Sequence, residues 1–153
     1  IDVNGKLISE WPVYRDYLEA DKVINVPVAK HHSLSRVTLG LKNLMGVMGG
    51  NRGDIHNNFE IKLADINRHI LPALTIIDAY RILIQNGPVG GNPDHVKMTK
   101  TLIASPCTVS ADYLALELFG LRLNQGEHVK YSADNGLARF DLNKLNVKRI
   151  SLT

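Results

Sequence analysis

Residues 22–28 read Lys-Val-Ile-Asn-Val-Pro-Val, a β-branched and mostly apolar run. Such a run is typical of a strand that is covered on both faces. Pro27 has no amide hydrogen to donate, so we expect it at the end of this strand. Residues 73–77 and 101–104 predict two further strands, residues 81–85 are a candidate continuation of the first of these, and residues 147–152 predict a last strand.

Helical patterns separate these strands. From residue 34 apolar residues recur at steps of three and four, which predicts a helix capped by Ser33 and ended by Gly49 and Gly50. Further helices are expected from Asn57 to about Pro72, from Ser105 to about Phe119, and over residues 127–133. Strands that alternate with helices predict an α/β fold: a mainly parallel sheet with helices packed on its faces, forming one domain over residues 1–153.

The composition narrows the class of protein. The chain has 153 residues, of which 44% are hydrophobic and 22% charged, as expected for one globular domain. No apolar run approaches the roughly 18 residues of a membrane span. The net charge of +3 comes from scattered lysines and arginines, which argues against a nucleic-acid partner. The chain begins with Ile1, so it is expected to be a mature product or a piece of a longer protein.

The segment Lys30, His31 and His32 carries the strongest indication of a ligand site. In an open parallel sheet, ligands bind beyond the carboxyl ends of the strands. The amides at the start of the helix predicted after Ser33 would favour a carboxylate or a phosphate. Thr38 and Lys42 would lie on the polar edge of that helix and flank the same ligand. The alternative is a solvated helix face with one histidine bonded in a turn.

A metal site is the weaker possibility. His32 and Asp78 are the candidate ligands, and His56 is another possible donor. No His-Glu-x-x-His spacing supports a metal site, and the identity of any metal or cofactor stays open. Asp78 follows an apolar run, where a carboxylate serves as base or ligand, or else simply caps a turn. Cys107 is expected to be a small buried side chain rather than a nucleophile.

The same residues carry a resemblance to a family. Residues 21–46 closely resemble the signature of the family called domain of unknown function 362. The later motifs at residues 76–79, 86–88, 103–105, 109–112 and 118–121 follow in the order of that family's pattern. The positions that the motif carries over are Lys30, His32, Thr38, Lys42, Asn43, Asp78 and Asp112.

The resemblance implies a prokaryotic protein, cytoplasmic or exported, in which a ferredoxin-like iron–sulfur segment accompanies this domain. It also implies further sequence ahead of residue 1. One departure is Pro106-Cys107, where the family places an aspartate. With Cys107 as its single cysteine, this chain cannot by itself supply the cysteines of an iron–sulfur cluster.

Two functions follow as hypotheses. The first is a ligand-binding, potentially catalytic domain for a small anionic or metal-bound molecule. In it the lysines supply charge, His32 transfers a proton or binds the ligand, Asn43 orients the ligand, and Asp78 acts as base or ligand. The second is a non-catalytic module that docks an iron–sulfur electron-transfer segment, which predicts a contiguous apolar patch on one face. The sequence alone does not decide whether the protein is an enzyme.

Overall fold

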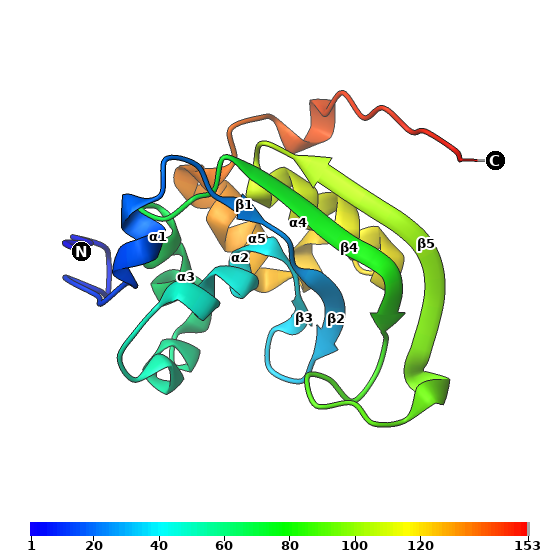
Figure 1. The fold of residues 1–153 in the computed structure, drawn as a ribbon, viewed down its shortest axis with the longest axis horizontal. Helices are drawn as coiled ribbons and strands as arrows, with labels where there is room; N and C mark the ends of the chain where they lie inside the picture. Colours follow the sequence, from blue (N-terminus) through cyan, green and yellow to red (C-terminus); the bar gives the residue numbers. More distant parts are fainter. Residues whose placement is uncertain (153) are drawn as a thin grey trace.

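The computed structural model describes residues 1–152 (Figure 1). The strands are β1 (Ile24–Asn25), β2 (Val28–His32), β3 (Arg36–Thr38), β4 (Leu74–Leu83) and β5 (Val96–Ser105). The α-helices are α1 (Arg15–Glu19), α2 (Gly40–Asn43), α3 (Phe59–Asn67), α4 (Thr108–Leu116) and α5 (Glu127–Ser132). Short helical turns cover Leu44–Val47, Arg52–His56, Pro93–His95, Glu117–Phe119, Leu123–Gln125, Ala133–Leu137 and Leu142–Lys144.

The five strands form one sheet around β4. β1 and β2 follow each other along one side of β4 and run parallel to it, with Ile24 opposite Leu74 and Val28 opposite Asp78. Between them Pro27 interrupts the strand, although its carbonyl still accepts the amide of Asp78 at 2.8 Å. β3 and β5 are antiparallel to β2 and β4 respectively, so the three strands that share a direction are flanked by two that oppose them.

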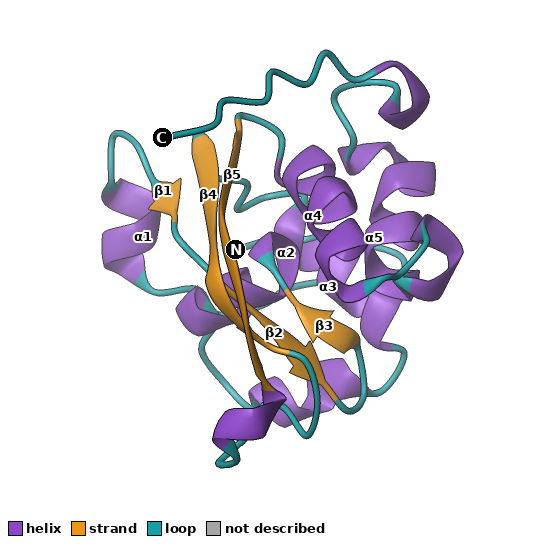
Figure 2. Ribbon diagram, turned by 90° about the vertical axis from the view of Figure 1, so that its right-hand side faces the viewer, coloured by secondary structure: helices purple, strands orange, loops and turns teal. Residues whose placement is uncertain are grey.

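Helices α2 to α5 lie on one face of the sheet, as Figure 2 shows. The side chains of β4 that point to this face are fully buried, for example Ile77 and Ile82. Thr75 and Thr108 share a buried hydrogen bond of 2.9 Å that joins β4 to α4. The predicted α/β class, with a single sheet and helices packed on it, is therefore confirmed.

The opposite face of the sheet is open and apolar. Alternation along the strands places large side chains there that are about half or more exposed to solvent: Ile24, Val26, Val28, Tyr80 and Leu102.

None of the helices in residues 1–152 is both long enough and apolar enough to cross a bilayer.

Two predicted elements are wrong. Residues 34–38 do not begin a helix: a turn follows β2, Arg36 takes a left-handed φ of 65°, and β3 returns antiparallel to β2. The spacing of Leu34, Val37 and Leu41 is compatible with one long helix. It is equally compatible with the observed hairpin followed by the short helix α2. Residues 147–152 form no strand, because the C-terminal segment lies across β5 and α4 instead of pairing with an edge.

Candidate functional site

His32 is the last residue of β2 and lies at the carboxyl end of the parallel strands. Its Nδ1 accepts the amides of Leu34 and Ser35 at 3.2 and 3.3 Å, so the side chain closes the turn of the hairpin. With Nδ1 an acceptor, the proton of the neutral ring is on Nε2. Burial, followed by the charge of Lys42, lowers the pKa of His32 to about 4. The ring is therefore neutral at pH 7.

Lys42 lies on α2 and is only 8% exposed. Its Nζ is 3.4 Å from Nε2 of His56, 3.8 Å from Sδ of Met45 and 4.7 Å from the centre of the Phe59 ring. Nδ1 of His56 is 3.3 Å from the carbonyl of Gly53, which can only accept, so Nε2 of the neutral ring accepts from Lys42. Burial, and to a lesser extent Lys30, lower the pKa of Lys42 to about 8.

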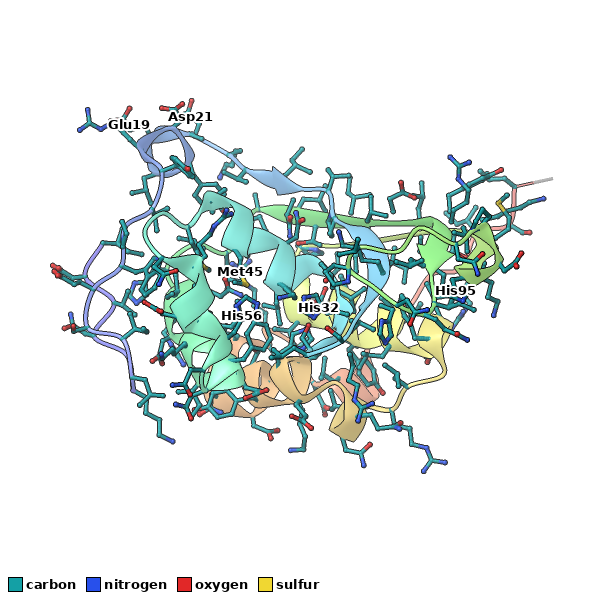
Figure 3. The ribbon with its side chains drawn as sticks, turned by 90° about the horizontal axis from the view of Figure 1, so that it is seen from below. Glu19, Asp21, His32, Met45, His56 and His95 are labelled. Carbon is teal, nitrogen blue, oxygen red and sulfur yellow. The ribbon has the colours of Figure 1, made fainter. Side chains whose placement is uncertain are left out.

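The rings of His32 and His56 stack with their centres 6.3 Å apart, and Figure 3 shows both beside Met45 and far from His95. Behind them the ring of Phe59 meets His128 of α5 edge-on at 5.7 Å. His128 is 1% exposed, and its Nε2 has no hydrogen-bond partner among residues 1–152. Burial, Lys42 and His32 lower the pKa of His128 to about 3. We refer to Lys30, His32, Lys42, His56 and His128 as the basic cluster.

No acidic side chain within residues 1–152 forms an ion pair with the basic cluster. Lys30 pairs across the hairpin with Thr38, whose hydroxyl is buried without a hydrogen-bond partner. Burying a cation without a counter-charge is costly. An anion from outside the chain would relieve this cost.

Buried polar groups hold the short helix α2, and with it Lys42, in place. The carboxylate of Asp112 accepts the amides of Gly40 and Leu41 at 2.7 and 2.9 Å. Asn25 donates to the carbonyl of Gly40, and Asn67 donates to that of Leu41, both at 3.0 Å. Complete burial raises the pKa of Asp112 to about 7, although the two amides oppose the shift.

Gly40 and Asn43 complete this arrangement. A Cβ added at Gly40 would lie 2.8 Å from the Asp112 carboxylate and 2.7 Å from Cγ2 of Thr108, so a larger residue does not fit there without movement. Asn43 donates to the side chain of Asn25 at 2.8 Å. Asn43 and Asp112 thus support the turn that carries Lys42.

The structure brings together four of the predicted site residues: Lys30, His32, Thr38 and Lys42. It places Asp78 elsewhere, in the middle of β4, where its carboxylate accepts the amide of Tyr80 at 2.9 Å. The prediction that Asp78 follows the end of its strand is wrong, because β4 continues to Leu83. The predicted anion site on the amides after Ser33 is also wrong, because no helix begins there and the amides of Leu34 and Ser35 donate to Nδ1 of His32.

The other predicted features near the hairpin have local roles. Nδ1 of His31 accepts the amide of Gly87 at 3.1 Å, so this ring ties the loop after β4 to β2. Cys107 is 2% exposed, in line with a packing role. Within residues 1–152 no group of three or more His, Cys, Asp or Glu side chains is arranged to hold a metal ion.

Sequence reasoning missed His128 and the role of Phe59. Phe59 lies in the helix predicted from Asn57 to about Pro72, and the sequence assigns it no role in the site. His128 stands alone in a short helix, 86 positions after Lys42, and no spacing rule connects the two. Only the packing of α5 against α3 brings them together.

Comparison with known proteins agrees with the resemblance in the sequence. A family model described as domain of unknown function (DUF362) matches residues 1–117. A thylakoid-associated protein of Synechocystis sp. is 31% identical over 115 residues, which are 70% of this chain and 35% of that protein. The chain thus spans about a third of the curated relative that it matches. No solved structure matches the chain. The match over residues 1–117 shows that this chain belongs to the DUF362 family.

Proposed function

We propose that the basic cluster binds a small anionic molecule. The observation that carries this proposal is the state of Lys42, a buried ammonium group with histidines and a second lysine around it and no carboxylate in reach within residues 1–152. A carboxylate or phosphate group placed beside Nζ would supply the missing counter-charge and accept its hydrogen bonds.

The surrounding groups support the same ligand class. Lys30, which is half-buried, adds positive charge to the site. Nε2 of His32 is available as a hydrogen-bond donor because Nδ1 accepts the amides of the hairpin turn. The unpartnered hydroxyl of Thr38 is a further polar contact. The engaged Nδ1 supports donation by His32 rather than abstraction of a proton. Asn43 and Asp112 act as positioning residues, and Asp78 has no part in this site.

A titration tests the proposal. The ¹⁵N-labelled chain is titrated at pH 7 with inorganic phosphate and, separately, with glycolate, and the amide shifts are followed by NMR. We expect saturable shifts at residues 30–45, and at least a tenfold weaker affinity in the double variant Lys30→Gln/His32→Gln. The matched control is Lys22→Gln/His95→Gln, which removes the same residue types away from the cluster.

Two outcomes would refute the site. One is the absence of any saturable shift at residues 30–45 of the wild-type chain. The other is unchanged affinity in the double variant. If the double variant loses its fold, judged by circular dichroism, the single variant Lys30→Gln at the half-buried rim replaces it and is held to the same criterion.

The open face of the sheet favours a second role, as a docking surface. Ile24, Val28 and Leu102 present apolar side chains to solvent. The first two lie in residues 22–28, whose composition is typical of a strand covered on both faces. The Synechocystis relative has about two thirds of its length outside the matched region. We infer that in longer members of the family this further sequence covers the open face. The iron–sulfur character of such a segment stays a prediction.

A further inference from the structure

Lys42 differs from every other lysine in residues 1–152. It is the buried one, whereas the others are half-buried or exposed. Its amine faces an acceptor nitrogen of His56 and the face of the Phe59 ring, with Lys30 as a neighbouring cation. Desolvation and a second cation are the two conditions that make a lysine amine nucleophilic at neutral pH.

We propose that Lys42 is a carbonyl-reactive amine that forms a Schiff base with a small aldehyde or ketone, whose carboxylate or phosphate group is held by Lys30 and His32. This inference rests on the anion site proposed above and narrows its ligand to an anionic carbonyl compound. The pKa of Lys42, lowered to about 8, supports it, because about a tenth of the amine is then neutral at pH 7.

The cluster supplies the proton transfers that this reaction needs. His56 accepts a proton from the Lys42 ammonium through Nε2, 3.4 Å away, and the free amine forms a C–N bond to the carbonyl carbon. After proton transfer from nitrogen to oxygen, His56 returns its proton to the hydroxyl group, which leaves as water when the C–O bond breaks. An ammonium and a carbonyl thus become a protonated imine and one water, with no oxidation or reduction.

The residues around Lys42 are also compatible with the protonated imine that the reaction forms. The protonated imine keeps its positive charge on the nitrogen, which lies 4.7 Å from the centre of the Phe59 ring in the free protein. The face of an aromatic ring stabilises a nearby cation. His32 and His128 are neutral at pH 7 because burial lowers the pKa of each, so they add no opposing charge.

Reductive trapping tests the inference. The chain is incubated at pH 7 with glyoxylate and sodium cyanoborohydride, and the modified lysines are located by peptide mass spectrometry over time. The neutral fraction of Lys42 exceeds that of an unperturbed lysine by roughly three hundredfold, and its lower basicity offsets part of this advantage. We therefore expect at least tenfold faster labelling of Lys42 than of exposed Lys22.

Variants and a competitor identify the source of the rate. The variant Lys42→Arg keeps the positive charge at this position but should form no adduct there. In the control variant Lys62→Arg, Lys42 should be labelled as fast as in the wild type. Glycolate carries the anion without the carbonyl, so it should slow the labelling of Lys42 and leave Lys22 unchanged. The comparison of Lys42 with Lys22 is made within the wild-type chain and needs no variant to fold.

The outcomes separate the two proposals. Equal labelling rates for Lys42 and Lys22 in a chain that binds glycolate would overturn the amine proposal and leave the anion site standing. Rapid labelling of Lys42 that glycolate does not slow would overturn the role given to Lys30 and His32. Selective labelling that glycolate suppresses supports both.

Discussion

At the scale of single residues, His32 and His128 show how burial sets the charge of the basic cluster. Both histidines have an ordinary pKa of 6.5, which burial lowers to about 4 in His32 and to about 3 in His128. Between pH 6.5 and the lowered pKa of each histidine, the folded chain therefore binds fewer protons than the unfolded chain. The stability from neutral histidines is complete above pH 6.5 and is lost as the pH falls toward the folded pKa.

Replacing His128 by phenylalanine should remove much of this acid sensitivity. The wild type should lose up to roughly 3 kcal/mol more stability than His128→Phe between pH 6.5 and pH 4, because one pKa unit corresponds to about 1.4 kcal/mol. Urea unfolding at several pH values measures this difference. Asp112, whose pKa is raised to about 7, acts in the opposite direction but equally in both proteins. His95→Phe serves as the control, and parallel pH profiles for wild type and His128→Phe would contradict the prediction.

At the scale of elements, α2 is a helix of four residues that cannot be stable by itself. Side chains from outside it satisfy its first amides and two of its carbonyls. Its existence therefore depends on tertiary contacts rather than on helix propensity. The orientation of Lys42 depends on the same contacts.

Asp112→Ala should destabilise the protein by about 2–4 kcal/mol, because it leaves the buried amides of Gly40 and Leu41 without an acceptor. Asp112→Asn keeps one acceptor oxygen and should cost less. Ser110→Ala on the same helix is the matched control, since the Ser110 hydroxyl is buried without a partner and its removal should cost little. Urea unfolding gives the three values. Equal stability of Asp112→Ala and Ser110→Ala would show that the carboxylate does not hold α2.

The elements also show what the sequence can predict. The helix predicted from Asn57 to about Pro72 contains α3, because its apolar residues recur at helical spacing. The strand predicted over residues 73–77 covers only the first part of β4, which continues to Leu83. The hairpin after β2 was not predicted, because Leu34 and Val37 are spaced as on a helix. The side chain of His32 closes the turn, and this contact is not a matter of periodicity. Lys30, His32, Thr38 and Lys42 were recognised as a group, although from a helix that does not exist in the predicted form.

At the scale of the whole molecule, the two faces of the sheet are unequal. One face packs against α2 to α5 (Figure 2). The other face exposes apolar side chains. Leu102 is 68% exposed on the edge strand β5 of this face, opposite Asp78. A hydrophobic surface of this kind marks an interaction site more often than an ordinary solvent boundary.

Replacing Leu102 by lysine should therefore change the free energy of unfolding differently in this chain and in longer members of the family. In this chain Leu102→Lys should change the free energy of unfolding by less than about 0.5 kcal/mol, as at other exposed positions. In a longer member of the family in which further sequence covers this face, a lysine at the equivalent position should cost about 1–3 kcal/mol, because the covered side chain would be buried there. Val89→Lys, at a loop residue that is 93% exposed, is the control in both proteins.

Two results would contradict this prediction. One is an equally small effect of the lysine in both proteins. The other is self-association of the short chain that Leu102→Lys abolishes, which would assign the open face to a second copy. Light scattering at several concentrations distinguishes these cases.

The bond between Asp112 and Gly40 has a consequence for how the protein is made. The two residues lie 72 positions apart, so the carboxylate reaches α2 only after α3, β4 and β5, which lie between them in the sequence, have been synthesised. Closing so long a loop is also an entropically costly step of folding. A nascent chain that ends before α4 would contain Lys42 but lack the group that positions it. The chemistry proposed for Lys42 would thus become available only once α4 has been synthesised.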